Sequence, residues 1–304
     1  MNFAIKTTNI SKRYGNNLAV NKVNINVPEG SVYGFVGENG SGKTTIMRLI
    51  MGLARPTEGT YELLGVDEHS REIYDVRSHI SAIIEAPSLV PTMTARENLE
   101  YACIYYGVKD LSVIDSVLKE VDLADTGKKK VKNFSLGMRQ RLGIGILLLN
   151  NPKLMLLDEP MNGLDPSGIA DLRNLIINLN KKGITFMISS HILSELEKVA
   201  THYGFISKGK LLKEISAEGL AKDFKKSIDL KSENLKEIEE ALAKEKVKDF
   251  EKYPTFVRVF DDILPLELLK KLDKHGIEVT EIKTNQIDVE DYYLSLIRGG
   301  QNNA

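Results

Sequence analysis

The stretch Gly37-Glu-Asn-Gly-Ser-Gly-Lys-Thr44 decides the fold of this chain, because it is a complete G-x-x-x-x-G-K-S/T phosphate-binding loop. The apolar run Val32–Val36 before it predicts a buried strand, and Lys43–Met51 predicts a helix after it. Small residues let the N–H groups of such a loop surround a polyphosphate at the positive end of the helix. The sequence therefore predicts a nucleotide site in a P-loop domain.

The side chains of this loop have separate expected roles. Lys43 would reach the β- and γ-phosphates, and the hydroxyl of Thr44 would bind Mg²⁺. Thr45 is either a nucleotide contact or an ordinary residue of the first helical turn. The residues expected to contact the nucleotide are Gly37, Asn39, Gly40, Ser41, Gly42, Lys43, Thr44 and Thr45.

The bulk composition is that of an ordinary globular protein. At 304 residues, the chain is long enough for one to three domains with a large core. Its net charge of −1 creates no overall field that would attract nucleic acid or an anionic membrane, and we expect no nucleic-acid partner. Cys103 is the single cysteine, which excludes a disulfide framework and a cysteine-based zinc site and fits a reducing compartment.

No stretch of the sequence has the length of a membrane span. Residues 1–6 lack the long apolar core of a signal peptide. Apolar stretches such as Ile144–Leu149 fall far short of the ~20 residues that cross a bilayer. We expect a cytoplasmic chain, and if it serves a membrane process, another chain must do the spanning.

Strand-like and helical segments alternate through the first two thirds of the chain, which is typical of an α/β domain with a largely parallel sheet. The predicted strands are Phe3–Ile10, Val23–Val27, Val32–Val36, Ile80–Ile84, Leu154–Leu157, Thr185–Ser189 and Tyr203–Ser207. The region of about 86–150 predicts helices instead, over Thr94–Tyr106, Ser112–Val121 and Leu136–Leu149. We expect residues 1–215 to form one domain, with this region as an inserted α-helical subdomain.

Residues 216–304 are richer in Lys and Glu, contain no nucleotide motif and predict a small C-terminal α+β domain. The expected order is β-α-β-β-α-β with a closing helix. The corresponding segments are Ile228–Leu230, Leu235–Ala243, Val247–Glu251, Phe256–Phe260, Pro265–His275, Glu278–Lys283 and Val289–Ile297. Pro254 supplies the turn between the two central strands.

A phosphate loop implies an acidic partner for the metal ion, and the chain offers one. The apolar strand Leu154–Leu157 leads into Asp158 and Glu159, and Pro160 then ends the strand. Asp158 would hold Mg²⁺, as acids do in P-loop NTPases. Glu159 stands where a general base could polarise the attacking water. The alternative is a pair of solvated acids at a strand end.

The segment Phe134-Ser135-Leu136-Gly137-Met138-Arg139-Gln140 carries a family resemblance. It resembles the signature (S-G-G-Q type) of the ATP-binding cassette (ABC) ATPases, with Leu136 where Gly is commoner. The resemblance covers residues 1–215 and implies a P-loop ABC ATPase core, ATP and Mg²⁺ as cofactors, and ATP hydrolysis coupled to transport. From the residues alone, Ser135 is a good helix N-cap, and Gly137 permits close approach of the backbone to a phosphate.

Other elements of the family follow in its usual order. Tyr14 matches the aromatic residue that stacks on adenine, and His191 matches the switch histidine that contacts the γ-phosphate. Gly163-Leu164-Asp165 matches the short loop that couples two cassettes. In the family, the signature closes on the ATP of an opposing cassette, here through Ser135, Gly137 and Gln140. Because this chain holds one cassette, the resemblance implies a homodimer.

Glu85 departs from the family pattern. It occupies the place of a Gln that contacts Mg²⁺ and the lining water and whose loop touches the membrane partner. A carboxylate there can bind metal more tightly or titrate, so Glu85 is a candidate for a catalytic and a metal-binding role; a solvated acid is the alternative. Glu85, followed by Pro87 and by Arg96–Leu99, resembles one branch of the family, the ATPases of bacterial exporters that protect against lantibiotics, bacitracin and similar peptide antibiotics.

The resemblance therefore implies an ATPase subunit that docks on transmembrane permease subunits at the inner face of the cell membrane. An exporter of another cargo, such as a drug, a lipid-linked compound or Na⁺, is the main alternative. A soluble ABC ATPase acting on the ribosome or on DNA is disfavoured, because the chain has one cassette and no sustained heptads. A kinase or GTPase would leave Phe134–Gln140 unexplained. The C-terminal domain could be regulatory or could support dimerisation.

Overall fold

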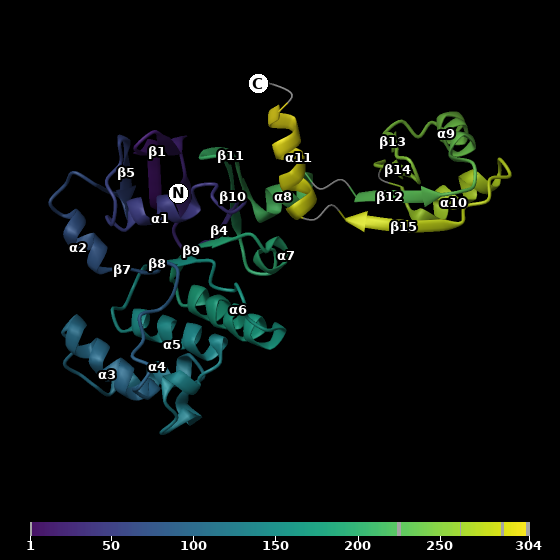
Figure 1. Ribbon diagram of the computed structural model, residues 1–304. Coiled ribbons are helices and arrows are strands. Elements are labelled where there is room, and N and C mark those ends of the chain that lie inside the picture. The colour runs from purple at the N-terminus through teal and green to yellow at the C-terminus, as the bar shows by residue number, and fades with distance from the viewer. Residues whose placement is uncertain (1, 224–225, 262, 287–288, 302–304) are drawn as a thin grey trace. The chain divides into compact units, whose positions relative to one another are not determined.

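The computed structural model describes residues 2–223, 226–261, 263–286 and 289–301 (Figure 1). The chain divides into two compact units, one made of Met1–Ala217 and Gly299–Ala304 and one made of Glu218–Arg298. The described residues form two sheets in the first unit and one in the second, and each unit has its own buried core.

The first unit is built on a six-stranded sheet in the order β11-β10-β4-β9-β8-β7. Its strands are β4 (Val32–Val36), β7 (Ile80–Ile83), β8 (Leu154–Asp158), β9 (Thr185–Ser190), β10 (His202–Ser207) and β11 (Lys210–Ser216). Neighbouring strands run parallel except at the β11 edge. All residues of β4 and β8 are buried, which explains their continuous apolar runs, because a parallel sheet is covered on both faces.

A second, antiparallel sheet lies in the same unit and was not predicted. Its strands are β1 (Phe3–Tyr14), β2 (Asn17–Val23), β3 (Asn26–Pro28), β5 (Glu58–Leu63) and β6 (Val66–Asp67). The predicted single strand Val23–Val27 is wrong, because β2 ends at Val23 and β3 begins at Asn26. Between them, the side chain of Asn24 accepts a hydrogen bond from the Asn9 N–H (2.7 Å), which interrupts the strand ladder.

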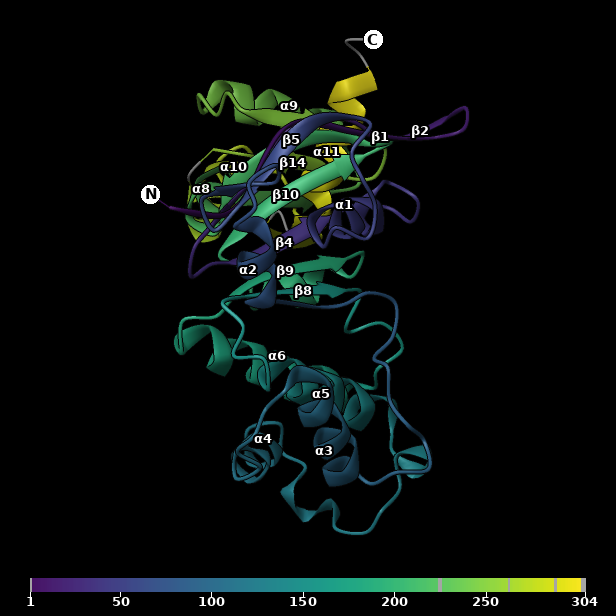
Figure 2. The ribbon, with the colours of Figure 1, turned by 90° about the vertical axis from the view of Figure 1, so that its left-hand side faces the viewer.

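The core of the first unit joins the two sheets. The helices beside them are α1 (Lys43–Ile50), α2 (Ile73–Ser78), α6 (Pro166–Lys181) and α7 (Leu193–Leu196). The next helix, α8 (Ala217–Asp223), begins at the last residue before the second unit. One buried cluster brings Ile5 of the antiparallel sheet together with Ile46 of α1 and Leu156 of β8. The two ribbon views place α6 on the opposite side of the parallel sheet from α1 (Figures 1 and 2). The helix that follows the phosphate loop is thus fixed between two sheets.

Residues 86–150 form the helical segment that the sequence predicts. It contains α3 (Ala95–Tyr106), α4 (Val113–Glu120), α5 (Leu136–Leu148) and two 3₁₀ turns (Ala124–Thr126 and Val131–Asn133), and no strand lies within it. Thr94 and Glu97 form a reciprocal capping box at the start of α3, as the Thr-x-x-Glu spacing favours. The P-loop fold class with an inserted α-helical subdomain is therefore confirmed.

The second unit has the predicted β-α-β-β-α-β order and a closing helix. Its elements are β12 (Lys226–Lys231), α9 (Leu235–Lys244), β13 (Phe250–Lys252), β14 (Val257–Val259), α10 (Pro265–Asp273), β15 (Glu281–Gln286) and α11 (Val289–Gln301). The sheet is antiparallel, in the order β13-β14-β12-β15. Its strand β13 begins three residues later than expected, because Val247 takes part in the cap that follows the C-terminus of α9. The Val247 N–H bonds the Leu242 carbonyl, and Lys246 has a φ of +60°, which are features of a Schellman C-cap.

Candidate functional site

A cavity of about 490 Å³ opens over the phosphate loop. Its lining residues are Tyr14, Asn17, Leu18, Ala19, Asn39, Gly40, Gly42, Lys43, Thr44, Thr45, Glu159, Lys208 and Gly209. Gly42 has a φ of +110°, and a Cβ atom there would lie 2.8 Å from the Ala19 carbonyl oxygen. A larger residue at this position would therefore be both strained and in collision with β2. We call this cavity the nucleotide cavity.

Sequence reasoning found part of this lining. Tyr14, Asn39, Gly40 and the residues 42–45 were predicted and line the nucleotide cavity, whereas Gly37 and Ser41 do not. It missed the segment Asn17–Ala19 of β2 and the turn Lys208–Gly209 between β10 and β11. The Lys-Gly pair at a strand end was the only sequence signal for that turn.

Lys43 is the buried cation of the nucleotide cavity. Its residue is only 5% exposed, and Nζ donates hydrogen bonds to the carbonyl oxygens of Gly37 (2.6 Å) and Glu38 (3.2 Å). Nζ also lies 3.3 Å from Oε1 of Glu159. A buried ammonium group needs such partners, since the desolvation of an unpaired charge is costly. The phosphate oxygens of a nucleotide would compete with these groups for the same cation.

Asp158 is held by two hydroxyl groups at the end of β8. Thr44 Oγ1 donates to Asp158 Oδ2 (2.7 Å), and Ser189 Oγ donates to Oδ1 (2.5 Å). Within the described ranges, no group of three or more His, Cys, Asp or Glu side chains could hold a metal ion. Mg²⁺ often takes one or two protein oxygens and fills its octahedron with phosphate oxygens and water. The hard oxygens of Thr44 and Asp158 therefore fit Mg²⁺ when a nucleotide supplies further ligands.

Glu159 lies between a cation and an imidazole. Its φ is +49°, and its N–H donates to Ser189 Oγ (2.9 Å), so the backbone is fixed in an uncommon conformation. The Glu159 Oε2 atom lies 2.7 Å from Nδ1 of His191 and accepts a hydrogen bond from the His191 N–H (3.3 Å). A carboxylate with this restraint has the position and partners of a general base oriented by a histidine.

The signature segment begins α5 and does not line the nucleotide cavity. Ser135 Oγ accepts the Met138 N–H (3.2 Å), so Ser135 is the N-cap of the helix. A Cβ atom on Gly137 would lie 3.4 Å from the Cα atom of Gly168 in α6, which is an ordinary van der Waals contact. Gln140 is 6% exposed, and its Oε1 has no hydrogen-bond partner among the described residues.

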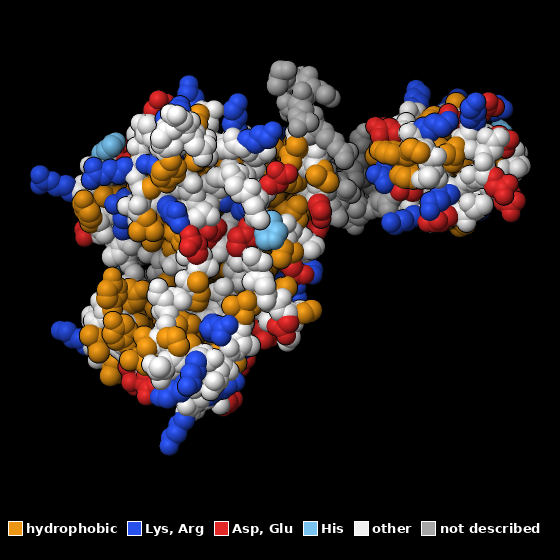
Figure 3. Space-filling view, viewed as in Figure 1, with side chains coloured by type: hydrophobic (Ala, Val, Ile, Leu, Met, Phe, Trp, Pro, Cys, Tyr) orange, Lys and Arg blue, Asp and Glu red, His pale blue; other side chains and the backbone are white. Residues whose placement is uncertain are grey.

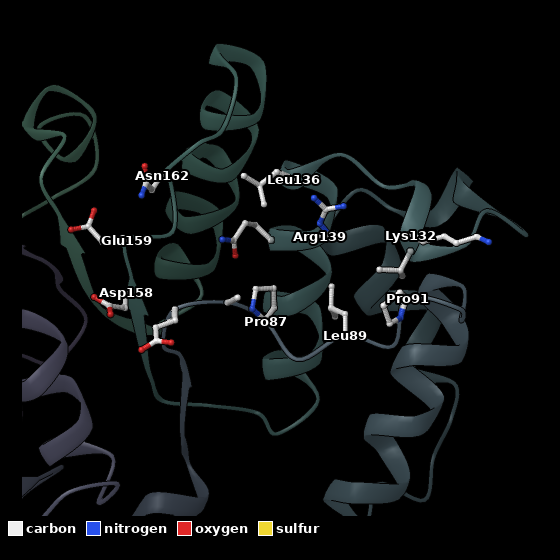
Figure 4. A pocket seen from close by; sticks show the side chains of 13 residues that line it. Pro87, Leu89, Pro91, Lys132, Leu136, Arg139, Asp158, Glu159 and Asn162 are labelled. Atoms are coloured by element: carbon white, nitrogen blue, oxygen red, sulfur yellow. The ribbon is translucent and has the colours of Figure 1, made fainter.

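A second cavity of about 530 Å³ lies between the end of β8 and the helical segment. It is lined by Glu85, Ala86, Pro87, Leu89, Pro91, Val131, Lys132, Leu136, Arg139, Gln140, Asp158, Glu159 and Asn162. In Figure 4, Asp158 and Glu159 stand on one wall, Leu136 and Arg139 on the other, and Pro87 lies between them. We call it the signature cavity. Glu159 lines both cavities, so the two cavities adjoin at this residue.

The structure places the Glu85 carboxylate against Arg48, at the signature cavity that Asp158 also lines. Its Oε1 lies 2.5 Å from a terminal guanidinium nitrogen of Arg48 in α1. Glu85 lines the signature cavity but not the nucleotide cavity. Sequence reasoning did not find Arg48, because a basic residue in the last turn of a helix is ordinary.

The fold and these two cavities define a P-loop ATPase of the cassette type. The sequence profile of the ABC transporter family matches residues 20–162. The chain is 41% identical over 304 residues to the bacitracin transport ATP-binding protein BcrA of Bacillus licheniformis, covering 99% of both chains. It is 42% identical over 234 residues to the lantibiotic transport ATP-binding protein SrtF of Streptococcus pyogenes, covering 77% of this chain and 95% of that one.

A solved structure shows the same fold. The dimeric, post-hydrolysis form of an ATP-binding cassette bound to ADP and Pi is 26% identical, with a TM-score of 0.62, over 70% of this chain and 98% of that chain. The chain therefore belongs to the ABC transporter family, as an ATP-binding and ATP-hydrolysing protein. No helix of the described ranges has the length and apolar character needed to cross a membrane.

Proposed function

We propose that this chain is the ATPase subunit of an exporter that removes bacitracin-type or lantibiotic-type peptide antibiotics and so protects the cell. The strongest support for this proposal is the 41% identity to a bacitracin transport ATP-binding protein over 99% of both chains. Glu85, in place of the usual Gln, supports the same branch. The reaction that this chain would catalyse is the hydrolysis of ATP to ADP and phosphate.

The geometry supports separate roles for the residues of the nucleotide cavity. Lys43 and the loop N–H groups would hold the phosphates, and Tyr14, which is half exposed at the cavity mouth, would stack on adenine. Thr44 and Asp158 would hold Mg²⁺, which when bound would neutralise charge on the phosphate oxygens. Glu159 would accept a proton from the attacking water, and His191 would keep the Glu159 carboxylate oriented.

A dimer is needed to complete this site. Ser135, Gly137 and Gln140 do not line the nucleotide cavity of their own chain, and the Gln140 side-chain oxygen is buried without a described partner. We infer that they contact ATP bound to a second copy of the chain, so that ATP joins two cassettes and hydrolysis releases them. A similar cassette was solved as a dimer.

An apolar patch on the helical segment supports docking on a permease. Tyr101, Ile104 and Tyr105 follow the i, i+3, i+4 spacing on one face of α3, and all three side chains are exposed. Figure 3 shows hydrophobic side chains gathered over this part of the first unit. Exposed patches of this kind mark interaction sites. We infer that the patch contacts transmembrane permease subunits, which would place the chain at the inner face of the cell membrane.

The second unit would be an accessory domain. We infer that residues 1–215 form the cassette, with its helical subdomain at about 86–150, and that 216–304 form the accessory part. The contact division at Ala217 and Glu218 supports this boundary. The alignment with the bacitracin relative covers nearly the whole chain, whereas the lantibiotic relative covers 77% of it, which favours bacitracin-type cargo.

Deleting the gene in its host tests this function. We expect increased sensitivity to bacitracin or to a lantibiotic, complemented by the wild-type chain but not by Lys43→Ala, because the buried cation is needed for ATP binding. If sensitivity to both classes of antibiotic is unchanged and the purified protein still hydrolyses ATP, the ATPase activity stands and the proposed cargo is wrong. Loss of co-purification with the permease in Ile104→Asp would test the docking patch separately.

A further inference from the structure

Arg48 and Glu85 form an ion pair that connects the nucleotide-binding helix to the start of the helical segment. Arg48 lies in the last turn of α1, four residues after Thr44, so both side chains project from the same side of that helix. Glu85 follows β7 and leads into residues 86–150. The 2.5 Å contact between them therefore joins two parts of the molecule that are 37 residues apart in sequence.

The backbone at Glu85 is held in an unfavourable turn. Glu85 has a φ of +73°, and the Ala86 N–H donates to the Ile84 carbonyl oxygen (3.1 Å). A three-residue turn with a positive φ at its central residue is rare and strained for a residue that is not glycine. Such a conformation persists where surrounding contacts fix it, and the Arg48 contact is one that the Glu85 side chain makes.

The charges around Glu85 give the ion pair a second consequence. Glu85 shares the signature cavity with two other carboxylates, Asp158 and Glu159. Each ATP would add further negative charge next to Asp158 and Glu159. A neutral Gln at position 85 would add none, whereas a carboxylate needs a nearby cation to offset its repulsion of the phosphates. Arg48 supplies that cation from α1.

We propose that Arg48 is a positioning residue for Glu85: it neutralises the carboxylate and holds the Ile84–Ala86 turn against α1. This inference rests on the proposed ATPase function and assigns the counter-ion that the replacement of Gln by Glu requires. Movement of α1 upon nucleotide binding would then be passed through the ion pair to the helical segment. Arg48 itself does not line the nucleotide cavity.

A double-mutant cycle tests the pairing. Four proteins are compared: wild type, Arg48→Met, Glu85→Gln and the double variant, with binding of a fluorescent ATP analogue measured in the presence of Mg²⁺. We expect Arg48→Met to weaken binding by about fivefold, the upper range for an exposed ion pair. In the Glu85→Gln background, Arg48→Met should weaken binding of the ATP analogue by less than about twofold, because no carboxylate is left unpaired. Arg48→Lys should restore most of the binding.

A matched ion pair provides the control. Arg96 and Asp115 link α3 to α4, with side-chain exposures of 45% and 63%, against 44% and 69% for Arg48 and Glu85. Arg96→Met should leave ATP binding unchanged. Thermal melting of each nucleotide-free variant shows whether it is folded. If Arg48→Met does not fold, Arg48→Gln takes its place in the cycle.

Two outcomes would overturn the inference. Equal losses from Arg48→Met in both backgrounds would mean that Arg48 acts independently of Glu85. No loss in either background would mean that the pair is an ordinary surface contact. If the wild type itself fails to bind the ATP analogue, the proposed function fails instead, so the two failures are distinguishable.

Discussion

The nucleotide cavity and the signature cavity share Glu159, yet their polar groups are paired to different extents. In the nucleotide cavity, Nζ of Lys43 contacts two carbonyl oxygens and Glu159, and the Thr44 hydroxyl donates to Asp158. In the signature cavity, Oε1 of Gln140 is buried without a described partner. Buried polar groups are normally satisfied, so the buried Gln140 oxygen favours the proposed contact with a second copy of the chain.

Of the substitutions that test this comparison, Glu159→Gln should lower ATP turnover the most, because Glu159 lines both cavities. We expect ATP turnover to fall by at least about 100-fold, since the general base is removed while its shape is kept. Binding should be retained, because Gln leaves the loop and Lys43 in place. Steady-state phosphate release measures the first effect and gel filtration with ATP the second, where a trapped dimer is expected. A monomer with normal turnover would contradict the proposed composite site.

Ser189→Ala should be next in size, because Ser189 Oγ donates to Asp158 and accepts the Glu159 N–H. Ser189 is fully buried, so loss of its hydroxyl leaves Oδ1 of Asp158 without this hydrogen bond and leaves the Glu159 N–H only the Ser189 carbonyl oxygen. We expect a loss of about 1–3 kcal/mol in the free energy of unfolding and roughly tenfold lower turnover. Denaturant melts and ATPase assays test this. The neighbouring Ser190→Ala is the control, because Ser190 Oγ bonds Ile192 rather than the two acids; equal effects of the two would refute a special role for Ser189.

Gln140→Leu should separate stability from function. Replacing a buried group that lacks a partner by an apolar one of similar size should change the free energy of unfolding by less than about 1 kcal/mol. Nucleotide binding by the single chain should also be unchanged, because Gln140 does not line the nucleotide cavity. Turnover should nevertheless fall about tenfold if Gln140 acts on a second copy. Equal turnover in Leu and wild-type proteins would show that the signature cavity is complete in one chain.

Glu97→Gln should have the smallest effect, because Glu97 lines neither the nucleotide cavity nor the signature cavity. The pKa of Glu97 is lowered, chiefly by the hydrogen bond from the Thr94 N–H and further by Lys130. A lowered pKa stabilises the fold above the unfolded value of about 4.3, and that contribution disappears as pH falls through the folded pKa. The melting temperature of wild type should therefore exceed that of Glu97→Gln at pH 7, and the difference should vanish in acid. If the difference in melting temperature does not change with pH, it arises from packing and not from the charge of Glu97.

Contiguous motifs were predictable because their geometry is local. The loop from Gly37 to Thr44 must precede a helix, and Asp158 and Glu159 must follow a buried strand, so the closeness of Thr44 to Asp158 could be anticipated. The Arg48–Glu85 pair and the Lys208–Gly209 turn could not be, because they depend on how α1, β7 and β10 are placed in space. The antiparallel sheet was missed for a related reason, since β5 and β6 are short and partly polar.

The amino-acid sequence alone indicates a P-loop ABC ATPase and the residues expected to bind phosphate, because backbone N–H groups, a lysine and a threonine in this order suit only a few ligands. It also determined that Glu85 replaces the usual Gln. Only the tertiary structure decided where that carboxylate goes, since the side chain of Glu85 is directed by Arg48 across 37 residues of chain. The structure likewise decided that Ser189 fixes both acids, because parallel strands β8 and β9 end at the same edge of the sheet.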